Sequence, residues 1–115
     1  MADTSAQVIR ELVEEELLGA VVDYRVVPAE TDEVMAALIE MADYFAADLI
    51  VTIGATGVAP RDIAPEATRQ VVDKDVPGIA EAIRAYRMSR SPDALWQRGV
   101  AGIRGRTLIV NLPGD

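Results

Sequence analysis

Residues 48–57 read D-L-I-V-T-I-G-A-T-G, a continuous apolar run that passes directly into a loop with two glycines. The run at 48–53 lacks the polar–apolar alternation of a half-exposed strand, so it predicts a strand that is buried on both faces of a parallel sheet. A second such run, T-L-I-V-N-L at residues 107–112, ends at Pro113 and predicts a second buried strand. Two buried strands of this kind predict an α/β fold in which helices cover the sheet.

The rest of the chain alternates between helical and extended patterns. Apolar residues recur every three to four positions in several segments, and Asp3 or Thr4 is expected to cap the first of them. The predicted helices span residues 4–18, 31–46, 65–74 and 79–89, a short helical segment begins at Ser91-Pro92, and a third strand spans 20–27. We therefore expect one domain over residues 1–115, with a three-layer, doubly wound, mostly parallel sheet and helices on both faces.

Composition narrows the chemistry that the chain can perform. Its 115 residues include no cysteine and no histidine, which excludes disulfides, thiolate metal sites and the commonest general base. Acid–base or metal chemistry therefore falls to carboxylates, which favour hard ions such as magnesium. The net charge of −8 argues against nonspecific nucleic-acid binding, and no apolar run approaches the roughly 18 residues of a membrane span. We expect a cytoplasmic protein with neither nucleic acid nor a membrane as its partner.

The charge is distributed unevenly along the chain. Residues 1–57 include two arginines and twelve acidic residues, whereas residues 58–115 include nine basic and seven acidic residues. Two interpretations remain open. The two halves form differently solvated surfaces, or the arginine-rich half binds an anionic ligand.

The loop G-A-T-G at 54–57 follows the end of a predicted buried strand, where ligands bind in open parallel sheets. Glycines permit positive φ and close backbone approach, so that N–H groups converge on a phosphate, and the Thr56 hydroxyl adds a donor. Arginine pairs with phosphate and aspartate binds magnesium, so Arg61 and Asp62 support a phosphate site. The alternatives are a plain strand-to-helix turn and mutual neutralisation of Arg61 and Asp62, because the loop matches no established phosphate-binding motif.

A longer stretch carries a family resemblance. The string GATGVAPRDIAPEATRQVVDKDVPGIAEAIR at 54–84, with RGVAGIRGRTLIVNLPG at 98–114, resembles the molybdopterin-binding domain of molybdenum-cofactor biosynthesis, the MogA/MoaB type. The resemblance extends from about Thr4 to Gly114. It implies a doubly wound α/β fold and a homotrimer. For the MogA branch it implies transfer of AMP from Mg-ATP to the substrate molybdopterin, which yields adenylylated molybdopterin and pyrophosphate.

The resemblance also assigns roles to individual residues. It implies that the glycine loop grips phosphate and that Asp62 is the catalytic residue, supporting Mg²⁺ and the nucleotide chemistry. It implies that the N-L-P-G turn at 111–114 lies along the same pocket. The phosphate- and molybdopterin-binding residues implied are Gly54, Thr56, Gly57, Arg61, Asn111, Pro113 and Gly114. Transfer of this kind depends on positioning and charge neutralisation, so a site without histidine is compatible with it.

Three positions depart from the family pattern. Ala55 replaces the second glycine of the usual G-G-T-G loop, and alanine is costly there if the position requires positive φ. Ala29 follows Pro28 where the family often has a catalytic aspartate. Gln97 replaces the serine of an L-S-R triplet, and Trp96 beside it is expected to be a packing or interface residue.

The ends of the chain depart as well. Family members begin with a strand before the first helix and continue into a helix after N-L-P-G. We expect a rearrangement or another chain to replace the strand, because unpaired backbone groups are costly in a buried sheet. The predicted helix at 31–46 is apolar on two faces, which predicts a contact with a further chain or a larger assembly.

Three functions therefore remain open. The first is a molybdopterin adenylyltransferase, intact, impaired or inactive. The second is a binding domain that keeps the phosphate loop without the chemistry. The third is a trimmed or engineered, catalytically silent oligomeric scaffold built on this fold.

Overall fold

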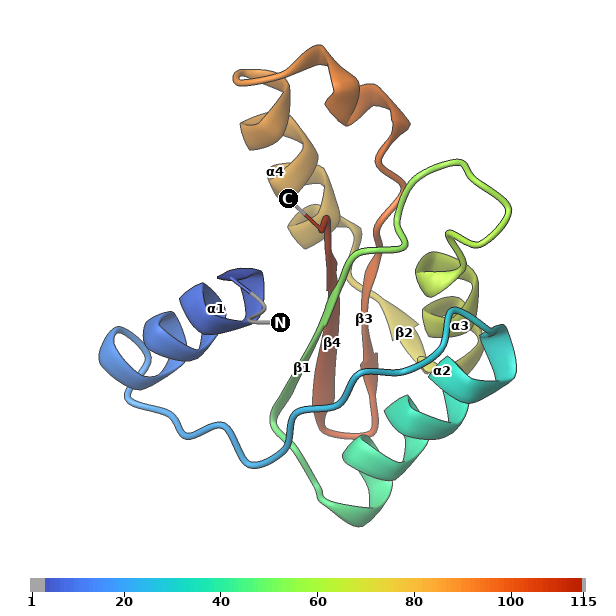
Figure 1. Cartoon of the computed structure of the whole chain (residues 1–115). Helices are drawn as coiled ribbons and strands as arrows, with labels where there is room; N and C mark the ends of the chain where they lie inside the picture. The colour runs from blue at the N-terminus through green and yellow to red at the C-terminus, as the bar shows by residue number, and fades with distance from the viewer. Residues whose placement is uncertain (1–3, 115) are drawn as a thin grey trace.

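A mixed four-stranded sheet forms the centre of the computed structural model, which describes residues 4–114 (Figure 1). Within these residues the strand order is β1-β4-β3-β2, with β1 at Leu49–Ile53, β4 at Thr107–Leu112, β3 at Ala101–Arg104 and β2 at Lys74–Asp75. The two predicted buried strands are β1 and β4, and they lie side by side in parallel. Their carboxyl ends therefore meet at the same edge of the sheet.

The prediction of a mostly parallel sheet is wrong for the described residues. Both β3 with β4 and β2 with β3 pair in the antiparallel direction. Only residues 105 and 106 connect β3 to β4, and so short a connection joins antiparallel neighbours. Gly105 has φ +58°, a left-handed conformation that glycine adopts without steric cost. The sequence patterns do not predict β2 and β3, because both strands are short and β3 begins with the small residues Ala101 and Gly102.

Helices cover both faces of the sheet, as predicted. The helices α2 (Thr31–Ile39) and α3 (Ala64–Val71) lie over one face, and α1 (Thr4–Glu15) and α4 (Pro77–Met88) lie on the other (Figure 1). The α/β class with a central sheet between helical layers is therefore confirmed. No helix among residues 4–114 is long and apolar enough to cross a membrane.

The helix boundaries follow the local sequence. Proline begins the first turn of both α3 and α4, where its missing N–H costs no hydrogen bond. The helix α3 ends earlier than predicted, because residues 74–75 join the sheet as β2. The Ser91 side chain accepts a hydrogen bond from the Asp93 N–H and thereby begins a short 3-10 helix at Pro92–Trp96. Asp3, one of the two expected caps of α1, lies outside the described residues.

The core lies between the sheet, α2 and α3. Its buried members are Leu38, Ala42, Ile50, Val71 and Ile109. The predicted helix at 31–46 continues beyond α2 as a π-helix at Glu40–Tyr44, and side chains from both of its apolar stripes pack against this core. Leu38 of this helix belongs to the same core cluster as Ile50 and Ile109 of the sheet, and α2 also contacts α3, so its two apolar faces are largely explained within the chain. A contact of this helix with another chain stays a prediction.

The predicted strand at residues 20–27 is wrong. The segment has no regular secondary structure, and its apolar residues Val22 and Val26 are exposed by 71% and 86%. A strand needs a hydrogen-bonded neighbour, and among residues 4–114 β1 pairs with β4 on one edge and with no strand on the other. Arg25 holds the segment to the end of α2 through ion pairs with Asp23 and Glu40.

Candidate functional site

The glycine loop and the N-L-P-G turn meet at the carboxyl ends of β1 and β4. The Gly54 N–H donates to the Leu112 carbonyl at 2.8 Å, which extends the parallel pairing by one step. A Cβ atom built on Gly114 would lie 3.4 Å from the Cα of Gly54, so the two backbones are in contact. The structure thus brings together two predicted site segments that lie far apart in the sequence.

The loop turns through two successive left-handed residues. Gly54 has φ +91° and Ala55 has φ +57°. The Ala55 carbonyl accepts a hydrogen bond from the Ala64 N–H at 3.1 Å, which ties the loop to the start of α3. An L-residue pays about 1–2 kcal/mol for this conformation, whereas glycine pays almost nothing. The position therefore does require positive φ, and alanine is the costly residue there.

Asp62 lies directly against the glycine loop. A Cβ atom on Gly57 would come within 2.8 Å of the Asp62 Oδ2 atom, so only glycine permits this approach. The same oxygen accepts a hydrogen bond from the Ala59 N–H at 3.0 Å, and the Asp62 N–H donates back to the Ala59 carbonyl at 2.9 Å. This closed turn holds one carboxylate oxygen and leaves the other free of hydrogen bonds within residues 4–114. Thr56, which lies between Ala55 and Gly57, is buried.

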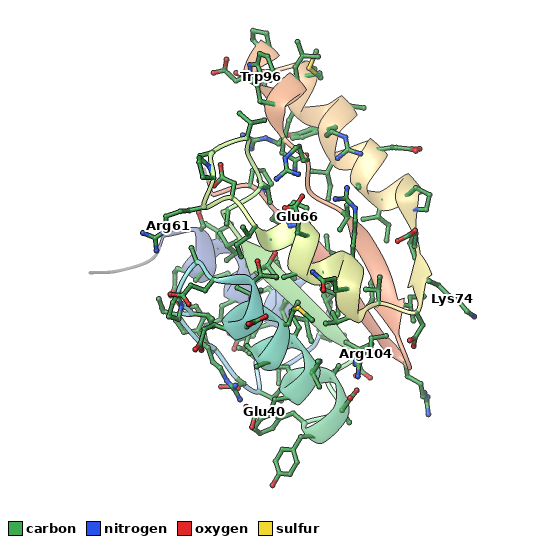
Figure 2. All side chains as sticks on the ribbon, turned by 90° about the vertical axis from the view of Figure 1, so that its right-hand side faces the viewer. Glu40, Arg61, Glu66, Lys74, Trp96 and Arg104 are labelled. Carbon is green, nitrogen blue, oxygen red and sulfur yellow. The ribbon has the colours of Figure 1, made fainter. Side chains whose placement is uncertain are left out.

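The Arg61 side chain does not lie close to the glycine loop and the Asp62 carboxylate (Figure 2). It is exposed and extends away from the domain (Figure 2). The ion pairs of the described residues do not include one between Arg61 and Asp62, so the two do not neutralise each other in this conformation. A role for Arg61 in binding phosphate stays a prediction that would require the side chain to swing back.

Asn111 supports the site from inside the core. Its side chain is 1% exposed and makes three hydrogen bonds. The Nδ2 group donates to the hydroxyls of Thr52 at 2.8 Å and Thr68 at 3.0 Å, and Oδ1 accepts from the Val100 N–H at 3.0 Å. These bonds join β4 to β1, to α3 and to the residue before β3. Direct contact of Asn111 with a ligand stays a prediction.

A groove opens beside the loop, on the face that carries α1 and α4. Pro113 and the last residues of β1 and β4 form its floor, and its volume is about 370 Å³. Its walls are formed by Ser5, Val8 and Ile9 of α1 and by Ile83 and Arg87 of α4. The groove is mostly apolar, and it places Arg87 near the same edge of the sheet as the glycine loop.

The sequence interpretation missed the residue with the most contacts to this loop. The Arg98 side chain donates from Nε to the Gly57 carbonyl and from Nη2 to the Asp62 carbonyl, both at 2.8 Å. It also pairs with both carboxylate oxygens of Glu66, at 2.6 and 3.2 Å. The hydrogen bond from Arg98 holds the pKa of Glu66 below its ordinary value, although burial opposes this shift. No spacing pattern indicates these contacts, which join residues 32 to 41 positions apart.

The positions that depart from the family pattern are placed as follows. The Gln97 Oε1 atom accepts a hydrogen bond from Arg84 at 3.3 Å, next to the loop that Arg98 contacts. Trp96 is 62% exposed at the far end of the 3-10 helix (Figure 2), so it is not packed within the chain, and an interface role stays a prediction. Ala29 lies in the irregular segment before α2 and supplies no carboxylate.

Comparisons with known proteins show similarity over nearly the whole chain. A family model described as a probable molybdopterin binding domain matches residues 1–115. The molybdopterin adenylyltransferase of Helicobacter pylori strain J99 is 43% identical over 113 residues, which cover 97% of this chain and 64% of that protein. The molybdopterin adenylyltransferase of Escherichia coli K12 is 38% identical over 91 residues, which cover 79% of this chain and 47% of that protein.

Solved structures of similar sequence superpose on the whole chain. The crystal structure of the molybdopterin biosynthesis enzyme MoaB from Thermus thermophilus superposes with a TM-score of 0.90 at 46% identity, covering 100% of this chain and 72% of that one. A molybdopterin biosynthesis protein from Mycobacterium abscessus superposes with a TM-score of 0.90 at 42% identity and the same coverage. The chain therefore spans about two thirds of the length of the curated relatives from Helicobacter pylori, and less than half of the one from Escherichia coli.

Proposed function

Since the chain belongs to the family of molybdopterin-binding domains of molybdenum-cofactor biosynthesis, we propose that it acts as a molybdopterin adenylyltransferase. In this reaction an oxygen of the molybdopterin phosphate attacks the α-phosphorus of ATP. The bond between the α-phosphorus and the oxygen that bridges to the β-phosphorus breaks, and pyrophosphate leaves. AMP is thereby joined to molybdopterin. We propose the cytoplasm as the place of this reaction.

The observation that carries the proposal is the meeting of three segments at one edge of the sheet. The glycine loop, the N-L-P-G turn and Asp62 come together at the carboxyl ends of the parallel strands β1 and β4. Gly54 and Gly114 let the two backbones meet at this edge, and Gly57 lets the Asp62 carboxylate approach the loop where the phosphate is proposed to bind. Because the reaction depends on positioning and charge stabilisation, this chain needs no acid–base pair.

The residues present fit a magnesium ion that arrives with the nucleotide. No group of three or more acidic side chains that would bind a metal by itself lies within residues 4–114. Magnesium is commonly held by one or two carboxylates together with substrate phosphates and water, so the single carboxylate of Asp62 is sufficient. When bound, the ion would neutralise charge on the phosphates of ATP. The hydrogen bond that the Asp62 carboxylate accepts from the Ala59 N–H orients that carboxylate.

The experiment measures binding of Mg-ATP by isothermal titration calorimetry, and then pyrophosphate release in the presence of molybdopterin. Asp62→Asn keeps an oxygen for the Ala59 N–H but removes the charge, so we expect turnover to fall by about a hundredfold with little change in stability. Asp75→Asn on β2, at the far edge of the sheet, is the matched control and should keep full turnover. Absence of both Mg-ATP binding and pyrophosphate release in the unmodified chain contradicts the proposal.

A second candidate is a domain that binds the nucleotide without transferring AMP. The observation that favours it is the single carboxylate at the loop, together with Ala29 at the position where the family resemblance implies a second one. This second function would be identified if calorimetry shows that the chain binds Mg-ATP but no pyrophosphate is released when molybdopterin is added.

The proposal includes assembly into a homotrimer, which the family resemblance implies. The exposed apolar residues of α1 and of the segment that follows it, among them Val8, Leu12 and Val22, offer a surface for such an assembly. Light scattering should give three times the chain mass of 12.4 kDa, and a monomer at micromolar concentration contradicts this part of the proposal.

A further inference from the structure

The guanidinium of Arg98 binds both ends of the loop at residues 57–62 and the first turn of α3. Its Nε and Nη2 groups bind the carbonyls of Gly57 and Asp62, the two ends of the loop that carries the candidate catalytic carboxylate. Its other contacts are to the Glu66 carboxylate in the first turn of α3. The Arg98 N–H adds a hydrogen bond to the Thr56 carbonyl at 2.7 Å. One residue therefore binds backbone carbonyls on both sides of the turn that carries Asp62.

Arginine is the side chain that suits this arrangement. Its planar guanidinium presents five N–H donors in a fixed fork, so one group can bind two carbonyls and a bidentate carboxylate at once. A lysine ammonium is a compact point charge on a flexible stem and cannot reach all of these acceptors in the same geometry. Within residues 4–114 the other hydrogen bonds that hold the loop at residues 57–62 are those of the turn at Ala59 and the bond from the Ala64 N–H to the Ala55 carbonyl.

Global stability is a poor explanation for these contacts. The side chains of Arg98 and Glu66 are 34% and 43% exposed, and ion pairs that exposed contribute little to folding. What the contacts do determine is the local position of two carbonyls and, through them, of the Asp62 carboxylate.

We propose that Arg98 is a positioning residue, whose fork holds residues 57–62 in the one conformation that places Asp62 against the glycine loop. The consequence for phosphate binding rests on the function proposed above, whereas the effect on the loop does not. Arg98 touches no substrate in this role and acts through the backbone that it binds.

Arg104 offers a matched control within the same chain. Its guanidinium binds Asp43 through two nitrogens, at 3.1 and 2.8 Å, and the Val71 carbonyl at 2.8 Å. It therefore has similar chemistry to Arg98, yet it lies at the opposite end of α3 from Glu66 (Figure 2). A change of arginine to lysine at both positions separates a role in the loop from a role in general stability.

The experiment compares the unmodified chain with its Arg98→Lys, Arg104→Lys and Glu66→Gln variants. Native-state hydrogen exchange should show exchange of the hydrogen-bonded amides within residues 56–64, those of Ala59, Asp62 and Ala64, accelerated roughly tenfold or more in Arg98→Lys, with the amides of β1 and β4 unchanged. Arg104→Lys should leave residues 56–64 protected. Glu66→Gln removes one anchor of the fork while leaving Arg98 in place, so a smaller acceleration of the same amides is expected.

The second measurement uses Mg-ATP as the probe. Arg98→Lys should raise the Kd for Mg-ATP about tenfold or more, whereas Arg104→Lys should leave it unchanged. Equal protection of residues 56–64 in Arg98→Lys and in the unmodified chain overturns the positioning role. If the unmodified chain does not bind Mg-ATP, the proposed function fails, and the exchange measurement still decides whether Arg98 holds the loop.

Discussion

Replacing Ala55 by glycine is expected to stabilise this domain, although glycine destabilises most positions. Ala55 has φ +57°, and an alanine in this left-handed region pays about 1–2 kcal/mol that glycine avoids. Two effects oppose the gain. Glycine adds conformational freedom to the unfolded chain, which costs about 0.4–1 kcal/mol, and a half-buried methyl group loses part of its contacts. The net stabilisation should be about 0.5 kcal/mol.

Ala82→Gly is the matched control. Ala82 lies exposed within α4, where the backbone is helical and glycine costs about 1 kcal/mol relative to alanine. The same chemical change should therefore have opposite signs at the two positions, and the difference between the variants should be about 1.5 kcal/mol.

Urea denaturation followed by circular dichroism measures both variants, and an unchanged slope with denaturant shows that only stability has changed. Ala55→Gly should raise the midpoint of thermal unfolding by about 2–3 °C, and Ala82→Gly should lower it. If both variants lose the same free energy of unfolding, Ala55 does not occupy the left-handed conformation, and the geometry of the glycine loop described above is wrong.

Three other changes test the site and its supports. Gly57→Ala places a Cβ atom within 2.8 Å of the Asp62 carboxylate, so it should displace that group and reduce Mg-ATP binding by roughly tenfold or more in calorimetry, and unchanged affinity would contradict the close approach. Asn111→Ala leaves the buried hydroxyl of Thr68 and the half-buried partner groups of Thr52 and Val100 without their hydrogen bonds to Asn111, so urea denaturation should show a loss of about 3 kcal/mol, and a loss no larger than that of a surface substitution would contradict the network. Because Arg98 lowers the pKa of Glu66 in the folded state, their pairing stabilises the domain above the unfolded pKa of about 4.3 and is lost as pH falls through the lower folded pKa. Glu66→Gln should therefore flatten the acid side of the stability profile measured by thermal melting between about pH 3 and pH 6, and an unaltered profile would contradict the pairing.

The sequence predicted the fold best where the pattern was strong and local. The apolar runs at 48–53 and 107–112 are β1 and β4, and the predicted helices all exist with shifted ends. The prediction failed where pairing decides the structure. Residues 20–27 have the composition of a strand but lack a strand beside them within residues 4–114, whereas residues 74–75 carry no strand signal and pair with β3.

The residues of the candidate site were also predicted best where the pattern is local in the sequence. The residue types needed for a phosphate loop, Gly54, Thr56, Gly57 and Asp62, stand close together in the sequence, and their order after a buried strand was enough to propose the site. Their family resemblance extended the proposal to the N-L-P-G turn. The sequence also predicted that alanine at position 55 is costly if the backbone there has a positive φ. The structure shows that it does.

What the sequence determined by itself is thus the set of local elements and the chemistry of the loop, because helices, buried strands and glycine turns depend on residues near one another in the chain. Only the tertiary structure decided the direction of β3, the burial of Asn111 and the bridge from Arg98 to the loop. The hydrogen bonds of Asn111 and Arg98 join groups that folding brings together across 11 to 59 positions. The direction of β3 depends on its pairing with β4 across a two-residue connection, and β3 is too short to be recognised from its sequence. Such contacts follow from how strands pair and layers pack, and neither periodicity nor spacing along the chain records them.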